Sequence, residues 1–217
     1  MTLRTELFLI LMVMTNFFLI GSSRLASYVR FVAIQGMFLG FLTLSIHQHD
    51  LSIRIFMVAI GNTLLKSFFF PWLLFKTIEQ VNIRQEIEPI VGYTLSIIIG
   101  GGLFGLSLWL AHHFFLSISS VSPLMISVAF FTLMIGFFLI VSRNKAITQV
   151  IGYIVIENGI YLFGVAFMQE APFLVELGVL LDLFVGVFVM QIIMHHIRRE
   201  FESLNVKHLS NLKDWEA

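Results

Sequence analysis

The amino-acid sequence predicts an all-α integral membrane protein of about seven transmembrane helices, with the N-terminus outside and the C-terminus in the cytoplasm. Of the 217 residues, 58% are hydrophobic and only 12% are charged, and the mean hydropathy is +0.94. Soluble domains are about half apolar and a quarter charged, so lipid is the expected solvent of this chain. The apolar runs are longer than a barrel strand and lack its alternation, which excludes a membrane β-barrel.

Polar breaks divide the chain into apolar runs, each long enough to cross a bilayer as a helix of about 20 residues. The predicted spans are residues 6–21, 25–46, 51–77, 89–113, 122–141, 146–168 and 172–197. We divide the chain into an N-terminal four-helix membrane segment (1–115), a three-helix membrane segment (116–199) and a cytoplasmic tail (200–217).

The distribution of lysine and arginine orients these spans, because cytoplasmic loops accumulate both residues. With the C-terminus in the cytoplasm, only Arg4 and Arg54 lie outside. The basic residues on the inner side are Arg24, Arg30, Lys76, Arg84, Arg143, Lys145, Arg198, Arg199, Lys207 and Lys213. This bias requires an odd number of spans and predicts a multi-pass protein of the inner (cytoplasmic) membrane. Arg30, just inside the second span, must extend back to the surface.

Small residues distinguish individual spans. Gly36 and Gly40 in the second span, and Gly101 and Gly105 in the fourth, are GxxxG pairs that permit close helix approach. Ordinary helix packing also accounts for such pairs, because small residues are common in membrane helices.

The span 122–141 has only Thr132 as a polar residue at depth, so we predict that this helix faces lipid.

Three ionisable residues lie near the predicted midplane: Lys66, Glu157 and Asp182. A charge at this depth costs about 3 kcal/mol on insertion scales, so each needs a partner, a water or a protonation event. Lys66 and one acid could form a static ion pair. Because the second acid leaves one titratable group over, we prefer a proton relay. Glu176 is a further proton-transfer candidate that could instead reach water by snorkelling. Pro71 predicts a backbone break beside Lys66.

Uncharged polar side chains at the same depth predict a polar seam across the bundle. They are Asn16, Gln35, Asn62, Tyr153, Asn158 and Tyr161. Asn62 lies one helical turn from Lys66, and the two tyrosines lie one turn before and after Glu157. We expect these groups to hold waters that connect the protonatable residues.

Composition excludes several kinds of chemistry. Cysteine is absent, which removes thiolate-ligated iron–sulfur clusters, cysteine zinc sites and disulfides. The seven histidines fall near the ends of the predicted spans, which argues against a bis-histidine haem. Thirteen basic and thirteen acidic residues cancel, so nucleic acid is not an expected partner. We therefore expect no catalytic site, metal or cofactor on this chain, and the lipid bilayer as its surroundings.

The C-terminal half resembles the hydrogenase 4 component E (HyfE) family at several short motifs. They are Arg143-Asn144, Ile151-Gly152-Tyr153, Glu157-Asn158-Gly159, Val175-Glu176-Leu177-Gly178, Asp182 and the stretch 206–213. Lys66 with Pro71, and Asn82-Ile83, extend the resemblance into the first half.

The last three spans are also similar to the NuoK subunit of respiratory complex I. In NuoK the second and third helices each carry a buried glutamate used in proton transfer. The resemblance places Ile154 at the first of these positions, Glu157 about one turn later, and Asp182 at the second. An acid is therefore kept on each helix at a changed depth.

The resemblance implies a non-catalytic membrane-arm subunit of a group 4 nickel–iron hydrogenase or a formate hydrogenlyase-type complex. Its partners would be antiporter-like and other membrane subunits and a soluble hydrogenase module, which would hold the nickel–iron centre and the iron–sulfur clusters. In our preferred hypothesis Glu157 and Asp182 accept and release protons, and the charge of Lys66 tunes their proton affinity. The ion moved is a proton or a sodium ion. The alternative is a scaffold that anchors the hydrogenase module and conducts nothing.

Overall fold

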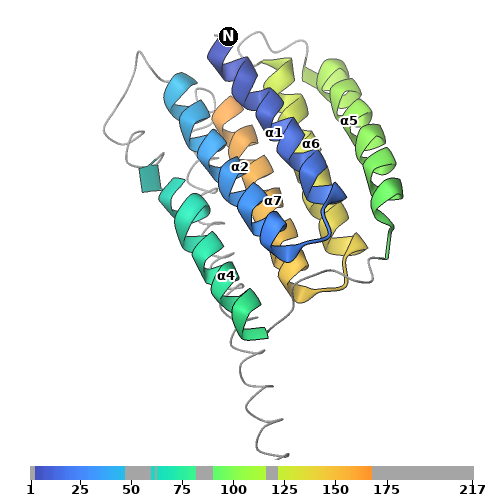
Figure 1. The fold of residues 1–217 in the computed structure, drawn as a ribbon. Helices are drawn as coiled ribbons and strands as arrows, with labels where there is room; N and C mark the ends of the chain where they lie inside the picture. Colours follow the sequence, from blue (N-terminus) through green and yellow to red (C-terminus); the bar gives the residue numbers. More distant parts are fainter. Residues whose placement is uncertain (1–2, 47–59, 62, 82–89, 116–121, 168–217) are drawn as a thin grey trace, which may run out of the picture.

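The computed structural model describes residues 3–46, 60–61, 63–81, 90–115 and 122–167, whose helices lie side by side (Figure 1). The helices are α1 (Leu3–Gly21), α2 (Leu25–Ile46), the π-helix η1 (Leu65–Phe69), α4 (Phe70–Val81), α5 (Tyr93–Phe115), α6 (Pro123–Ser142) and α7 (Ala146–Ala166). Among these, α1, α2, α5, α6 and α7 are long and apolar enough to cross a membrane. The chain therefore has the pattern of a multi-pass membrane protein.

The observed helices follow the predicted spans closely. The bounds of α2 are those predicted, whereas the third span continues beyond residue 77 to Val81 and α5 begins at Tyr93 instead of residue 89. The prediction of a helical membrane protein is confirmed for the part of the chain that the structure describes. The last predicted span, 172–197, lies outside the described residues, so the number of seven spans and the orientation stay predictions.

Helices α6 and α7 approach each other closely because glycines face the opposite backbone. A Cβ atom on Gly136 would lie 2.8 Å from the carbonyl oxygen of Gly152, and one on Gly159 would lie 3.1 Å from that of Ala129. No side chain larger than hydrogen fits these positions without displacing a helix. The motif Glu157-Asn158-Gly159 therefore includes one of the residues that set the α6–α7 distance.

The prediction that the helix at 122–141 faces lipid is wrong. Helix α6 packs against α7, α5 and α1, and 56% of the residues in its apolar 18-residue stretch are buried. For α5 the buried share is 22%, the lowest among the five candidate spans in the described part. Lipid tails and a packed core are equally apolar, so hydropathy cannot distinguish a helix in the centre from one at the edge.

The two GxxxG pairs differ in what they contact. A Cβ atom on Gly36 would lie 2.9 Å from the Cβ atom of Lys66, and one on Gly40 would collide with the same segment of the chain. Cβ atoms added at Gly101 or Gly105 would meet nothing within 4 Å in the described structure. The first pair thus lets the backbone of α2 lie directly against the segment that carries Lys66.

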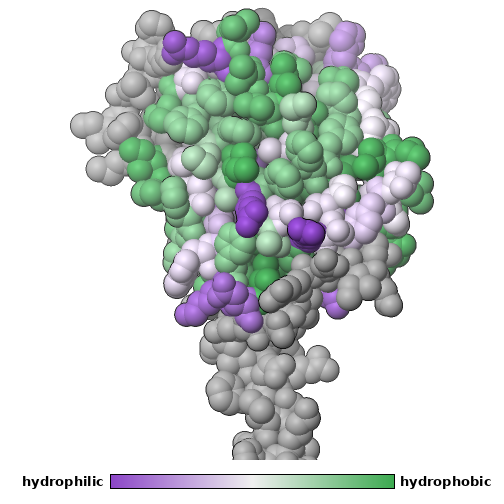
Figure 2. All heavy atoms as spheres, in the orientation of Figure 1, coloured by the Kyte–Doolittle hydropathy of each residue, from purple (hydrophilic) through white to green (hydrophobic). Residues whose placement is uncertain are grey.

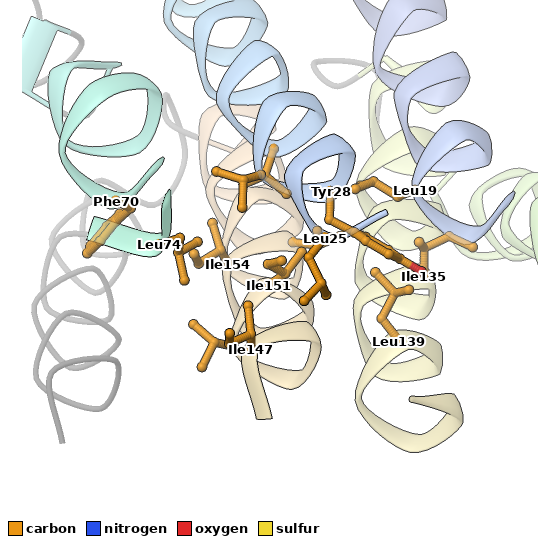
Figure 3. Close-up of a cluster of buried hydrophobic side chains, with 14 of the residues drawn as sticks. Leu19, Leu25, Tyr28, Phe70, Leu74, Ile135, Leu139, Ile147, Ile151 and Ile154 are labelled. Carbon is orange, nitrogen blue, oxygen red and sulfur yellow. The ribbon is translucent and has the colours of Figure 1, made fainter. Parts of the chain in front are cut away.

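A buried hydrophobic cluster joins α1, α2, α4, α6 and α7 (Figure 3). Its members include Leu19, Tyr28, Leu74, Ile135 and Ile151. The predicted N-terminal and three-helix segments therefore share one hydrophobic core in the described part of the chain. A second cluster, which includes Leu9, Leu39 and Leu162, lies farther along α1, α2, α6 and α7.

Candidate functional site

Six of the polar residues predicted near the midplane form a buried layer between the two hydrophobic clusters: Asn16, Gln35, Lys66, Glu157, Asn158 and Tyr161. On α7 the first cluster ends at Val155 and the second begins at Tyr161, so Glu157 and Asn158 fall between them. On α1 the corresponding gap holds Asn16. Apolar side chains on both sides therefore separate this layer from the ends of the bundle.

Lys66 and Glu157 form an ion pair in the polar layer. Lys66 Nζ lies 2.6 Å from Glu157 Oε1, and both side chains are only 1% exposed. The ammonium also lies over the ring of Tyr161, 5.1 Å from its centroid, and this attraction strengthens when the cation is removed from water. Glu157 Oε2 has no hydrogen-bond partner among the described residues, so it can accept a proton without breaking a hydrogen bond within that part of the chain.

The π-helix η1 positions Lys66, and the proline that follows it explains this helix. The N–H of Phe70 donates to the carbonyl oxygen of Leu65, five residues earlier, which is the π-helical pattern. Pro71 has no N–H for the carbonyl of Ser67, and its ring would clash with that carbonyl in a regular α-helix. The backbone break predicted beside Lys66 is therefore a wider helical turn, of a kind that is frequent at functional sites.

A chain of direct hydrogen bonds continues the polar layer across four helices. Asn158 Nδ2 donates to Gln35 Oε1 at 3.1 Å, and Gln35 Nε2 donates to Asn16 Oδ1 at 2.9 Å. Asn16 Nδ2 then donates to Thr132 Oγ1 at 2.9 Å, and the Thr132 hydroxyl donates to the carbonyl of Val128 at 2.7 Å. The four side chains are fully buried. We call them the amide chain.

The direction of the amide chain follows from its end at Thr132. A hydroxyl has one proton, and because Thr132 gives it to a backbone carbonyl, its oxygen must accept from Asn16. Each amide must then present its NH₂ group toward α6 and its carbonyl oxygen toward α7. The last carbonyl oxygen, Asn158 Oδ1, has no partner among the described residues. These amides bind each other directly, in contrast to the expectation that water lies between them, and an amide cannot titrate.

Replacing Gln35 with leucine should destabilise the protein, because it leaves a carbonyl of Asn16 and an NH₂ group of Asn158 buried without a partner. Each such loss costs about 1–3 kcal/mol. We expect a clearly lower thermal unfolding temperature of the purified protein in detergent. Ser45→Ala is the matched control, since the Ser45 hydroxyl only donates to the carbonyl of Phe41 at an exposed position. Equal unfolding temperatures would contradict a structural role for the amide chain.

Tyr161 is held in place from α2. Its hydroxyl lies 3.2 Å from Thr43 Oγ1, and Thr43 itself donates to the carbonyl of Leu39 at 2.9 Å. Tyr161 is therefore the donor in this hydrogen bond. The hydrogen bond keeps the ring beneath the ammonium of Lys66, so Thr43 belongs to the site indirectly. No sequence motif indicated Thr43.

The remaining predicted site residues lie elsewhere or outside the described part. Tyr153 is 38% exposed, so the structure places it apart from the buried layer. Asn62, Glu176 and Asp182 fall outside the described residues. Their assignment as supporting or proton-transfer residues stays a prediction.

Arg143 is a buried arginine, although its place in the sequence predicts a cytoplasmic loop. Its side chain is 1% exposed, and its Nη2 donates to the carbonyl of Ile20 at the end of α1, at 2.8 Å. Its Nη1 donates to the carbonyl of Val91, just before α5, at 3.2 Å, and the guanidinium lies 4.8 Å from the ring centroid of Tyr93. The C-terminal end of a helix carries partial negative charge, which a cation stabilises. Arg143 thus joins the C-terminal end of α1 and the residues just before α5 to the α6–α7 turn.

The fold and the site together define a multi-pass membrane protein with a buried polar layer that contains the Lys66–Glu157 ion pair. Residues 124–214 match the family model of NADH-ubiquinone/plastoquinone oxidoreductase chain 4L, which is the NuoK domain. Over 88 residues the chain is 34% identical to hydrogenase-4 component E of Escherichia coli strain K12 and of Shigella flexneri, which covers 41% of this chain and 41% of each relative. These matches confirm the resemblance to hydrogenase 4 component E with a NuoK-like C-terminal part.

A longer match has a lower identity. The chain is 25% identical over 204 residues to an uncharacterized protein of Mycobacterium tuberculosis, covering 94% of this chain and 93% of the relative. The N-terminal helices therefore have a counterpart beyond the NuoK-like part. No solved structure matches the chain.

Proposed function

We propose that this chain is a non-catalytic membrane subunit of a complex I-like, membrane-bound hydrogenase complex, and that it helps to move protons or sodium ions across the inner membrane. The matches to chain 4L and to hydrogenase-4 component E support the kind of complex. The observation that carries the ion-transfer role is the buried Lys66–Glu157 pair between two hydrophobic clusters. A charged pair at this depth is costly for a purely structural purpose.

In this proposal Glu157 is the acid that exchanges the proton and Lys66 is the charge that controls it. Protonation of Glu157 cancels its negative charge and removes the ion pair. Lys66 then remains over the ring of Tyr161, where its charge favours ionisation of a second carboxylate within reach. Asp182, on the next predicted span, is the proposed second acid, and Glu176 is a proposed group nearer the outer surface.

The amide chain lies beside this route and is not part of it. Its members carry no titratable proton, and its hydrogen bonds end at the backbone carbonyl of Val128. The amide chain instead fixes the rotation of α7, and so it positions Glu157 toward Lys66. Asn16, Gln35 and Asn158 are therefore proposed as positioning residues.

The proposed partners are antiporter-like and other membrane subunits together with a soluble hydrogenase module. The nickel–iron centre and the iron–sulfur clusters would be held by those subunits, which would carry out the redox reaction. The second candidate function is a scaffold that conducts no ions. The amide chain favours it, because direct hydrogen bonds across four helices are suited to fixing helix register.

Replacing Glu157 with glutamine tests the proposed function. The amide keeps the shape of the side chain but cannot exchange a proton, so we expect at least a tenfold lower proton uptake coupled to the redox reaction. The purified complex would be reconstituted in proteoliposomes with an internal pH-sensitive dye, and variants compared at equal loading. Asp182→Asn should act similarly, and the double substitution should be little worse than the more severe single one.

Glu79→Gln is the matched control, because Glu79 is an exposed carboxylate on α4. It should leave proton uptake unchanged. Full uptake by the Glu157→Gln, Asp182→Asn double variant would contradict the relay and leave the scaffold. A purified chain that has no hydrogenase or antiporter-like subunit beside it would contradict the proposed complex.

A further inference from the structure

Two apolar grooves lie on the surface formed by α1 and α2, one near each end of this helix pair. The larger has a volume of about 540 Å³ and lies where α1 ends and α2 begins. Its lining includes Phe17, Phe18, Gly21, Ser22, Phe31 and Ile97. The smaller, about 330 Å³, lies at the start of α1 and the end of α2. Its lining includes Leu3, Arg4, Leu7, Phe8, Phe41 and Leu44.

A stacked phenylalanine pair forms part of the wall of each groove and joins the two helices. The rings of Phe18 and Phe31 are 5.1 Å apart with an interplanar angle of 5°, and those of Phe8 and Phe41 are 6.1 Å apart with an angle of 15°. Phe18 and Phe41 still remain more than half exposed. These flat apolar surfaces suit the packing of an extended hydrocarbon chain.

Two basic residues lie close in the sequence to residues that line the larger groove. Arg24 follows the lining residue Ser22 by two positions, and Arg30 directly precedes the lining residue Phe31. Both arginines are exposed, and neither has an ion-pair partner among the described residues. Figure 2 shows strongly hydrophilic side chains within a largely apolar face, near the α1–α2 turn and the start of α2. Exposed arginines at the edge of a hydrocarbon layer attract anionic lipid headgroups.

The separation of the grooves matches a bilayer. Helix α1 has 19 residues, which span about 28 Å at 1.5 Å per residue, close to the hydrocarbon thickness of about 30 Å. Arg4 and Arg24 therefore stand at the two headgroup levels, and each groove extends from its own headgroup level toward the middle. A molecule that fits the larger groove has an anionic head and an apolar tail.

We propose that the larger groove binds an anionic phospholipid, with an acyl chain along Phe18 and Phe31 and the phosphate at Arg24 and Arg30. At the end of the bundle that holds the smaller groove, Glu6 lies on the same first turn of α1 as the lining residue Arg4, so that end has no comparable excess of positive charge. The charge selectivity therefore belongs to the larger groove. The α1–α2 face is turned toward the bilayer, and partner subunits bind other faces of the bundle.

Lipid retention measured by native mass spectrometry tests this inference. The chain, purified with its accompanying subunits and delipidated, would be mixed with phosphatidylglycerol or with phosphatidylcholine in detergent. We expect preferential retention of phosphatidylglycerol, and at least a tenfold loss of it in the Arg24→Gln, Arg30→Gln double variant. Lys76→Gln, an exposed lysine on α4, should retain phosphatidylglycerol as the unmodified chain does. Equal retention of both lipids, or full retention by the double variant, would overturn the proposal.

Photocrosslinking in native membranes gives an independent result. A benzophenone amino acid would replace Met14, which lines the larger groove and is 53% exposed. We expect an adduct with the mass of a phospholipid. An adduct with the mass of another subunit, or of a second copy of this chain, would overturn the assignment of this face to lipid. Neither measurement depends on ion transfer by Glu157, so the two proposals fail separately.

Discussion

Lys66→Met is expected to destabilise the protein by about 3–5 kcal/mol, because it leaves the carboxylate of Glu157 buried without its cation. Glu157→Gln should cost less, since the ring of Tyr161 still stabilises the ammonium. In the double variant both charges are gone, so we expect a loss well below the sum of the two. Unfolding of the purified single and double variants in detergent, followed by tryptophan fluorescence, would give the three values.

The same variants separate a static ion pair from a relay. If the pair is static, the double variant should recover ion-coupled activity in proportion to its recovered stability. For a relay the double variant should be stable and should still lack proton uptake, because no carboxylate remains on α7. If the double variant loses as much stability as the two single variants together, the ion pair itself is contradicted.

Arg143→Gln is expected to reduce the amount of assembled protein severalfold. The substitution removes two hydrogen bonds from a charged donor to backbone carbonyls, each worth about 1.5–3 kcal/mol. It also removes the cation from the end of α1. Arg143→Lys should recover only part of the loss, because an ammonium lacks the planar fork that reaches Ile20 and Val91 together. Membrane levels and thermal unfolding temperatures would measure both variants.

Lys76→Gln is the control for this series, because Lys76 is an exposed basic residue on α4 of the same predicted inner side. It removes one charge from the positive-inside pattern without touching a buried contact. If Arg143→Gln and the control reduce assembly equally, Arg143 acts only through topology. A selective effect of Arg143→Gln shows that it acts through the contacts it makes.

The sequence is a good guide to depth along the membrane normal. Apolar runs locate the helices, and a rise of about 1.5 Å per residue is enough to place Lys66 and Glu157 at the same level. Depth does not specify rotation, however. The sequence leaves open which acid pairs with Lys66, and only the packing of α2, η1 and α7 brings Glu157 to its ammonium.

The sequence does not predict contacts between side chains and backbone atoms, for a different reason. The carbonyls that bind Arg143 belong to Ile20 and Val91, and a carbonyl is present whatever the side chain is. Nothing in residue type marks such a partner. The hydroxyl of Thr132 stands out in the sequence, but its role depends on the position of α6 inside the bundle.

The π-helix η1 also makes the site sensitive to chain length. A π-helical turn holds one residue more than an α-helical turn, so the chain before Leu65–Phe69 is out of phase with α4 by one residue, or about 100°. Deleting Phe68, which is 62% exposed, would keep Lys66 and the other polar residues of the site and still rotate the preceding residues by that angle. The direction of Lys66 thus depends on the number of residues between it and Pro71. Substitutions alone would not reveal this dependence.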